Sequence, residues 1–284
     1  MSRIVYVNGE YLPEENATIS IFDRGFLFAD GVYEVTSVID GKILAFDGHV
    51  ERLQRSLREL QMDTPCTMEE LEAIHRELIV RNNLVEGLIY LQVTRGAADR
   101  DFAFPVGVKP SLVLFTQAKN ILNNPVVENG IKVISIPDIR WHRRDIKTVQ
   151  LLAPSLGKMA AKAAGADDAW LVEDGFVTEG TSNNVYIVKK DGTIVTRNLS
   201  TDILHGITRA AVLKCANEAQ MKIEERPFTI AEAQDAAEAF FTSASAFACS
   251  VVEIDGVKIG NGTPGETAKR LREIYLIETM KTAK

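Results

Sequence analysis

The sequence has few cysteines, few histidines and no excess of positive charge. Its 284 residues include 3 cysteines and 4 histidines, and 32 basic residues stand against 39 acidic ones. Cys66, Cys215 and Cys249 are odd in number and lack metal-ligand spacing, so we expect free thiols in a reducing compartment. The net charge of −7 argues against a nucleic-acid partner, because neutralising phosphates requires a basic surface.

Long apolar segments are also missing. No apolar run approaches the length that spans a membrane, and the first residues do not begin a signal-peptide core. We therefore expect a cytoplasmic protein with no membrane partner, and the histidine spacing predicts no metal site. The hydrophobic content of 46% is nevertheless sufficient for one large domain or two medium ones. A short basic cluster, Arg140, Arg143 and Arg144, fits an anion site inside an enzyme.

Turn and cap signals predict that strands and helices are mixed in both halves. Dipeptides typical of two-residue hairpins lie between apolar runs at Asn8-Gly9, Asp40-Gly41, Asp174-Gly175, Asp191-Gly192 and Asp255-Gly256. Helix-start signals are found at Asp47 and at three capping boxes, Thr67 with Glu70, Thr229 with Glu232, and Thr263 with Glu266. Because the elements do not alternate regularly as βαβ units, we predict a mixed α+β fold with antiparallel-rich sheets.

A polar stretch that contains proline and lacks periodicity follows residue 118, and it predicts a linker. We place an N-terminal α+β domain at residues 1–118, the linker at 119–127 and a C-terminal α+β domain at 128–284. The C-terminal domain would then carry Lys147.

Two segments of the C-terminal half carry residues with specific chemistry, Trp141–Lys147 and Thr178–Val185. A lysine amine forms a Schiff base with an aldehyde when its pKa is depressed. A carboxylate such as Glu179 can hold a pyridine nitrogen protonated, which makes the ring an electron sink. Together these two demands describe a pyridoxal-phosphate site. From these residues alone, however, a salt-bridged strand end followed by an ordinary turn is the more common explanation.

The same segments resemble signatures of the fold-type IV aminotransferases, and most closely those of the D-amino-acid-specific members. The resemblance keeps its order and spacing over nearly the whole chain. Its further motifs are Asp23–Phe26, Phe28–Val35, His49–Leu53, Gln92–Gly96, Gly206–Arg209, Thr242–Ser245 and Glu253–Gly256.

The resemblance implies roles for the residues of a cofactor site. Lys147 would bind the aldehyde of pyridoxal 5'-phosphate as a Schiff base and then move the substrate proton, and Glu179 would pair with the pyridine nitrogen. The phosphate would be bound by Arg52, Gly206, Ile207, Thr208, Ser243, Ala244 and Ser245. Ile207 and Thr208 would open a helix whose free N–H groups suit a phosphate. Without the resemblance, a surface lysine, a turn carboxylate, a helix cap and a solvated arginine would explain the same residues.

The resemblance also implies a substrate site. Tyr33 and Arg100 correspond to positions that bind the substrate carboxylate, and the loop with Arg100 would come from the partner subunit of a homodimer. Phe102 stands where the D-specific enzymes have a histidine. Because a phenylalanine offers apolar surface in place of a donor, we predict relaxed recognition that extends to (R)-amines.

These roles predict transamination between a D-amino acid and a 2-oxo acid, such as D-alanine with 2-oxoglutarate or D-glutamate with pyruvate. A branched-chain L-amino-acid aminotransferase and an aminodeoxychorismate lyase of the same fold are the alternatives. A vitamer-binding protein without activity is the alternative of another class, and it would need neither Lys147 nor Glu179.

Overall fold

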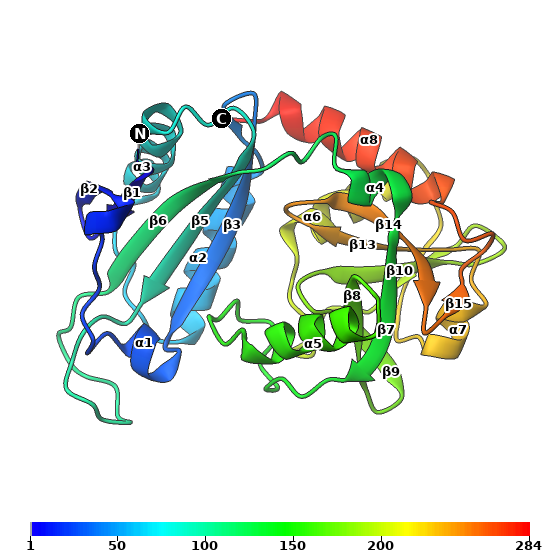
Figure 1. Ribbon diagram of the computed structural model, residues 1–284, viewed down its shortest axis with the longest axis horizontal. Coiled ribbons are helices and arrows are strands. Elements are labelled where there is room, and N and C mark those ends of the chain that lie inside the picture. Colours follow the sequence, from blue (N-terminus) through cyan, green and yellow to red (C-terminus); the bar gives the residue numbers. More distant parts are fainter. Residues whose placement is uncertain (1) are drawn as a thin grey trace. The chain divides into compact units, whose positions relative to one another are not determined.

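The computed structural model describes residues 2–284, which fall into two compact units (Figure 1). The N-terminal unit extends as far as Ile121 and includes the segments Ile146–Gln150 and Thr282–Lys284. The C-terminal unit consists of Leu122–Asp145 and Leu151–Lys281. The mixed α+β fold expected from the sequence is confirmed in both units.

This division differs from the expected one at 1–118, 119–127 and 128–284, because the segment with Lys147 belongs to the N-terminal unit. Its backbone pairs with the start of a strand of that unit. The N–H of Tyr33 donates to the carbonyl of Lys147 at 3.0 Å, and the N–H of Val149 donates to the carbonyl of Gly31 at 3.1 Å. Such pairing between distant segments leaves no local pattern in the sequence, so a linear division could not include it.

The N-terminal unit is built on a six-stranded antiparallel sheet in the order β2-β1-β6-β5-β3-β4. Its strands are β1 (Ile4–Val7), β2 (Glu10–Pro13), β3 (Gly31–Ile39), β4 (Lys42–Ile43), β5 (Gly87–Thr94) and β6 (Ser111–Ala118). Its helices are the short 3-10 helix η1 (Glu14–Asn16) and the α-helices α1 (Arg24–Phe28), α2 (Phe46–Glu59) and α3 (Met68–Arg81).

The core of this unit lies between the sheet and helices α2 and α3, which run along the sheet in Figure 1. Val50, Leu53 and Leu57 of α2 are buried there, on one face of the helix. The capping box of α3 is confirmed. The Thr67 hydroxyl accepts from Glu70 N–H at 3.2 Å, and the Glu70 carboxylate accepts from Thr67 N–H at 2.8 Å.

The C-terminal unit contains a nine-stranded mixed sheet in the order β12-β11-β10-β13-β14-β7-β8-β9, with β15 paired to β14. Its strands are β7 (Ile131–Pro137), β8 (Asp168–Glu173), β9 (Phe176–Gly180), β10 (Asn184–Val188), β11 (Ile194–Thr196), β12 (Ile223–Glu225), β13 (Glu238–Ser243), β14 (Phe247–Ile254) and β15 (Val257–Lys258). Its helices are α4 (Pro125–Asn129), α5 (Leu152–Ala163), α6 (Ile207–Glu218), α7 (Ile230–Gln234) and α8 (Glu266–Lys281).

Four of the expected two-residue hairpin turns are confirmed, and in each the first residue has a positive φ near 50°. They lie at Asn8-Gly9, Asp40-Gly41, Asp174-Gly175 and Asp255-Gly256. The expectation for Asp191-Gly192 is wrong, since β10 and β11 are joined by five residues. Gly192 N–H donates to the Lys189 carbonyl at 2.8 Å and Gly192 has a φ of 83°, as in a longer hairpin loop with one glycine in the left-handed region.

Two expected helix starts are also wrong. The N-cap of α2 is Ala45, and Asp47 lies inside the first turn. Helix α8 begins at Glu266, and its Thr267 N–H donates to the Glu238 carboxylate at 3.0 Å, so a side chain from β13 satisfies this helix end. The hydroxyl of Thr229, by contrast, accepts from Glu232 N–H at 3.1 Å, as expected. None of the helices in residues 2–284 combines the length and apolar composition that a bilayer crossing requires.

Candidate active site

Lys147 is half-buried in the N-terminal unit beside Tyr33 of β3. Its Nζ lies 4.1 Å from the centroid of the Tyr33 ring, and its backbone pairs with the same strand. Ile146 is buried in the core on one side, which anchors the segment. The lysine amine is therefore placed at a defined position on the sheet. Two residues with expected roles, Lys147 and Tyr33, lie together.

Arg52 forms a buried cluster with Glu34 and His49. Its Nε and Nη2 donate to the two oxygens of Glu34 at 2.8 and 2.7 Å, and His49 Nδ1 lies 2.7 Å from the same carboxylate. Burial acts to raise the pKa of Glu34, but the Arg52 guanidinium and the hydrogen bonds lower it to about 2. Glu34 is thus a carboxylate. Arg52, which the sequence assigns to the phosphate, is held by two charge-assisted bonds.

His49 is uncharged in this cluster. Burial lowers its pKa despite the hydrogen bond to Glu34, and the positive charges of Arg52 and Lys147 act in the same direction. The neutral imidazole of His49 donates from Nδ1 to the Glu34 carboxylate, in addition to the two bonds from Arg52. Lys147 therefore lies near a locked polar cluster whose net charge is close to zero.

Arg100 and Phe102 lie in the loop between β5 and β6, and both are exposed. The Arg100 guanidinium carbon is 5.4 Å from the ring centroids of both Phe28 and Phe102, so the arginine is held by cation–π contacts. The buried Arg24 side chain ties the loop to α1 by donating to the Asp101 carbonyl at 2.6 Å. The position of this arginine is set by two aromatic rings and a buried anchor.

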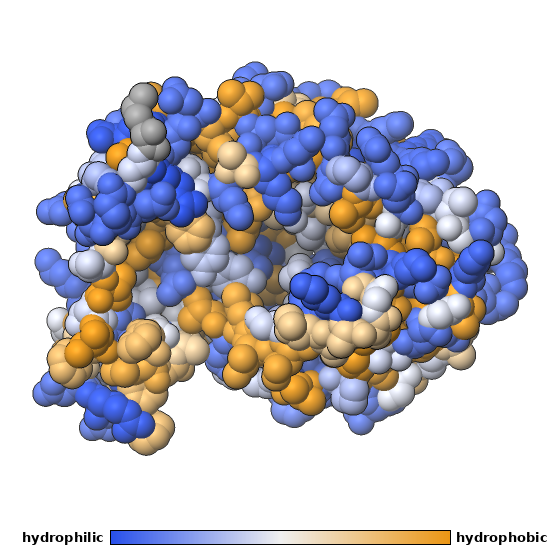
Figure 2. All heavy atoms as spheres, viewed as in Figure 1, coloured by the Kyte–Doolittle hydropathy of each residue, from blue (hydrophilic) through white to orange (hydrophobic). Residues whose placement is uncertain are grey.

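The loop and α1 form an exposed apolar surface at one end of the N-terminal unit, at the lower left of Figure 2. We call it the loop patch. Its members are Ile21, Phe22, Phe26, Phe102, Phe104 and Val106.

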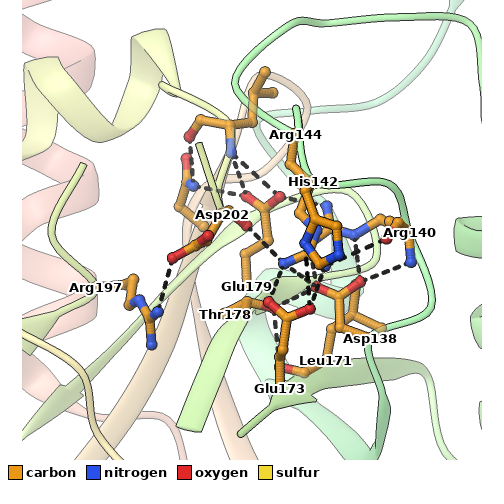
Figure 3. Close-up of polar contacts among 12 residues, drawn as sticks. Asp138, Arg140, His142, Arg144, Leu171, Glu173, Thr178, Glu179, Arg197 and Asp202 are labelled. Atoms are coloured by element: carbon orange, nitrogen blue, oxygen red, sulfur yellow. Dashed lines mark hydrogen bonds and ion pairs between the residues drawn. The ribbon is translucent and has the colours of Figure 1, made fainter. Parts of the chain in front are cut away.

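Glu179 of β9 lies in the C-terminal unit, 3% exposed, in a network of buried charged groups (Figure 3). Arg140 Nη1 donates to its Oε1 at 2.5 Å. The same guanidinium donates from Nε and Nη2 to Asp138 at 2.9 and 2.7 Å, so it bridges two carboxylates. Asp138 also accepts from the Thr178 hydroxyl at 2.7 Å.

Neutral donors complete the surroundings of Glu179. Its carboxylate accepts from Asn184 Nδ2 at 3.0 Å and from Leu204 N–H at 3.1 Å. Burial raises the pKa of Glu179, while the Arg140 guanidinium and these hydrogen bonds lower it and offset part of the effect of burial. The proton affinity of this carboxylate therefore depends on its cationic neighbour, which opposes the effect of burial.

Helix α6 begins at Ile207, as the sequence predicts, and its N-cap is Gly206. No side chain among the described residues caps this end, so the first-turn N–H groups are not bonded by a cap residue. A Cβ at Gly206 would overlap Asn184 Oδ1, which explains the glycine. Asn184 therefore connects Glu179 to the start of α6, since its amide also donates to the Leu204 carbonyl at 2.9 Å.

The other residues assigned to the phosphate are half-buried. Ser243 ends β13, and Ala244 and Ser245 lie in the turn that leads to β14. Ser243 Oγ accepts from Ala246 N–H at 3.2 Å. Lys147, Tyr33 and Arg52 belong to the N-terminal unit, whereas Glu179, Gly206–Thr208 and Ser243–Ser245 belong to the C-terminal unit.

The sequence reasoning missed four residues of these clusters, Glu34, Asp138, Arg140 and Asn184. Glu34 and Asn184 lie inside motifs that were recognised, but only their neighbours received roles. Arg140 was noted as one member of a basic cluster. An aspartate and an arginine two residues apart at a strand end, Asp138 and Arg140, were the available signal for this pair.

Comparison with known proteins identifies the family. The sequence pattern of "Amino-transferase class IV" matches residues 31–254, which is most of the chain and includes both clusters. The chain belongs to the class IV aminotransferases. It is thus an aminotransferase, and enzymes of this class take pyridoxal 5'-phosphate as cofactor.

Individual relatives cover nearly the whole chain. The D-alanine aminotransferase of Staphylococcus haemolyticus is 39% identical over 270 residues, 95% of each chain. That of Bacillus licheniformis is 39% identical over 284 residues, 98% of this chain and 99% of the relative. Among solved structures, the branched-chain amino acid aminotransferase of Thermoproteus uzoniensis with norvaline has a TM-score of 0.84 at 25% identity, covering 97% and 94% of the two chains. A putative 4-amino-4-deoxychorismate lyase from Legionella pneumophila has a TM-score of 0.82 at 26% identity, covering 93% of this chain and 96% of its own.

The residues present fit pyridoxal phosphate. Glu179 is a buried carboxylate held by Arg140, and a carboxylate is what a protonated pyridine nitrogen needs. The start of α6 offers backbone N–H groups and the positive end of a 12-residue helix, which suit a phosphate. The side chain of Lys147 carries an amine, the group that can bind an aldehyde.

Proposed function

We propose that this aminotransferase exchanges an amino group between a D-amino acid and a 2-oxo acid. The substrate pair would be D-alanine with 2-oxoglutarate, giving pyruvate and D-glutamate. The observation that carries the proposal is the 39% identity to D-alanine aminotransferases over nearly the whole chain. The branched-chain enzymes among the structural relatives share less of the sequence, 25% in the Thermoproteus uzoniensis enzyme.

Lys147 is the catalytic residue of the proposal. Bound pyridoxal phosphate supplies an aldehyde that takes up amino groups and a ring that accepts the electron pair left behind by a departing α-proton. Lys147 Nζ would hold the aldehyde, give way to the substrate amine, accept the proton from the substrate α-carbon and deliver it to C4′ of the cofactor. Glu179 would keep the pyridine nitrogen protonated. Its burial favours this role, because a desolvated carboxylate interacts strongly with a cationic partner.

The phosphate group would be held at the start of α6 by Gly206, Ile207 and Thr208, and at the β13–β14 turn by Ser243, Ala244 and Ser245. Arg52 would contribute N–H donors whose direction is fixed by Glu34. An arginine locked by a carboxylate loses little side-chain entropy when it contacts a further anion.

Tyr33 and Arg100 would bind the substrate carboxylate, and Phe102 would replace a polar contact by an apolar one. We infer from Phe102 that (R)-amines without a carboxylate are also accepted at a lower rate. The Arg100 guanidinium is exposed and planar, as recognition of a carboxylate requires.

The enzyme would act as a homodimer in the cytoplasm, with the Arg100 loop contributed to the partner subunit. The loop patch supports the dimer, since an exposed cluster of large apolar side chains indicates a protein interface. The three cysteines, which form no disulfides among the described residues, fit a reducing compartment.

Two related activities remain as rivals with specific support. The likeness to branched-chain aminotransferases favours L-leucine-type substrates, and the likeness to an aminodeoxychorismate lyase favours a reaction that needs no 2-oxo acid.

A coupled assay separates the D-amino-acid activity from the branched-chain activity. The purified enzyme is incubated with D-alanine, L-alanine or L-leucine, each with and without 2-oxoglutarate, and pyruvate formation is followed with lactate dehydrogenase where alanine is the donor. Glutamate formation is measured in all reactions by chiral chromatography. The proposal predicts pyruvate and D-glutamate from D-alanine only when 2-oxoglutarate is present. L-Glutamate from L-leucine would overturn the proposal in favour of a branched-chain enzyme. If neither D-alanine nor L-leucine is turned over, the proposed substrate class is wrong.

A further inference from the structure

Arg140 is mostly buried, with 13% of its side chain exposed, and it contacts two carboxylates of the C-terminal unit (Figure 3). The side chain of Asp138 is fully buried and that of Glu179 is 4% exposed. The guanidinium uses Nε and Nη2 for Asp138, which leaves Nη1 directed at Glu179. The Arg140 guanidinium therefore contacts both buried carboxylates.

The Asp138 carboxylate is itself fixed from other directions. Thr178 donates its hydroxyl to Asp138 at 2.7 Å, and Arg144 Nη1 lies 3.4 Å from the same oxygen. Arg144 in turn is held by Glu173 through two hydrogen bonds of 2.7 and 2.8 Å. Arg140 is thus fixed through Nε and Nη2 at Asp138, and its Nη1 donates to Glu179.

We propose that Arg140 is a positioning residue that keeps Glu179 ionised, so that the proton shared between Glu179 and the pyridine nitrogen stays on the nitrogen. The inference rests on the proposed role of Glu179 as partner of that nitrogen. It adds that Glu179 alone is insufficient, and that the guanidinium 2.5 Å away decides which of the two groups carries the proton.

The physical reason is the burial of the carboxylate. Without a cation nearby, a desolvated carboxyl group favours its neutral form and competes for the proton. A positive charge in contact with the carboxylate stabilises the anion more than it destabilises a cation on the far side of that anion, because the Coulomb energy falls with distance. Asp138 acts in the opposite direction, since its negative charge raises the proton affinity of Glu179. The remaining contacts of Glu179, from Asn184 and Leu204, come from neutral donors.

The opposing effects of Arg140 and Asp138 separate a charge effect from a structural one. Losing Arg140 removes the cation, whereas Asp138→Asn disturbs the same network and removes only an anion. If the network merely holds β9 in place, both substitutions change the protonation of the pyridine nitrogen in the same way. If the charge of Arg140 matters, only the loss of Arg140 removes the proton from the nitrogen.

The test uses holoenzyme reconstituted with pyridoxal phosphate carrying ¹⁵N in the ring, and it reads the ¹⁵N chemical shift at neutral pH, which reports directly whether the nitrogen is protonated. The variants are Arg140→Met and Arg140→Gln, which lose the charge, and Arg140→Lys, which keeps it. Asp138→Asn is the control within the network. Arg226→Met is the control outside it, since Arg226 also bridges two carboxylates, Glu224 and Glu232.

We expect the protonated position in the wild type and in Arg140→Lys, Asp138→Asn and Arg226→Met. In Arg140→Met the ¹⁵N resonance should move toward the unprotonated position by more than half of the separation between protonated and unprotonated reference compounds. Arg140→Gln should show the same shift, and it replaces the methionine variant if that variant fails to fold. A wild-type shift in the charge-loss variants overturns the proposal, and so does an equal loss in Asp138→Asn. A wild-type protein that binds no pyridoxal phosphate would instead overturn the proposed function.

Discussion

Lys147 Nζ lies 4.1 Å from the centroid of the Tyr33 ring, and the backbones of the same two residues are joined by a hydrogen bond from Tyr33 N–H to the Lys147 carbonyl. The amine proposed to bind the cofactor is therefore positioned by a strand of the N-terminal sheet. A group held on a rigid element keeps a defined geometry, which catalysis of proton transfer requires.

Lys147→Ala should abolish transamination while leaving the fold intact, because the amine contacts a half-exposed ring and fills no core position. We expect the turnover rate to fall by at least about 100-fold, the usual scale for loss of an acid–base group. Steady-state assay with D-alanine measures this. The exposed Lys162 of α5, changed to alanine in parallel, should leave the rate unchanged, and retained activity in Lys147→Ala would contradict the role assigned to this lysine.

Glu34→Gln should destabilise the N-terminal unit. The change removes the charge that Arg52 pairs with in a buried site, and breaking a buried ion pair costs roughly 3–5 kcal/mol. Urea unfolding of the apoprotein measures the free energy of unfolding. Glu77→Gln, which breaks an exposed pair with Arg81 on α3, should cost less than about 1 kcal/mol. Equal effects of the two substitutions would show that the buried cluster has no special energetic role.

His75 predicts a loss of stability in mild acid. Burial lowers its pKa from 6.5 to about 4, so the unfolded chain binds a proton between these pH values and the folded chain does not. The free energy of unfolding linked to His75 is therefore at its full value above pH 6.5. It falls by about 3 kcal/mol as the pH is lowered toward 4. Unfolding free energies measured across this range should fall less steeply in His75→Gln than in the wild type.

The exposed His142 provides the control for this titration, since its side chain is 84% exposed. His142→Gln should keep the wild-type slope of unfolding free energy against pH. A His75→Gln protein with that same slope would refute the assignment of the acid sensitivity to His75.

Phe102→His should restore a donor for the substrate carboxylate. A hydrogen bond to a charged group contributes about 1.5–3 kcal/mol, so the KM for D-alanine should fall roughly tenfold or more. The rate with an (R)-aromatic amine should fall at the same time, since apolar surface is lost. Phe104→His in the same loop is the matched control. If Phe102→His leaves the ratio of kcat/KM for D-alanine to kcat/KM for the (R)-amine unchanged, Phe102 does not determine substrate specificity.

Local signals in the sequence predicted a good part of this architecture. The hairpins at Asn8-Gly9 and Asp174-Gly175 and the capping box of Thr67 were predictable because their chemistry lies within a few residues. Lys147 and Glu179 were identified from motifs that resemble a family.

Relations between distant residues were not predictable. Glu238 satisfies the start of α8 from 29 positions away, and Arg140 contacts Glu179 across 39 positions. The segment with Lys147 belongs to the N-terminal unit through backbone pairing of Lys147 with Tyr33 and of Val149 with Gly31, which no side-chain pattern encodes. These contacts depend on how strands are ordered in the sheets, and a single sequence does not contain that order in any local pattern.

The visible absorbance of the purified protein with pyridoxal phosphate tests both the proposed Schiff base at Lys147 and the proposed handedness of the substrate. Addition of D-alanine and, separately, of L-alanine shows whether the band changes and for which hand of substrate. The account predicts a yellow protein that is bleached by D-alanine and not by L-alanine, with the band absent in Lys147→Ala. A protein that stays colourless after pyridoxal phosphate is added, or one that is bleached by L-substrates alone, would contradict it.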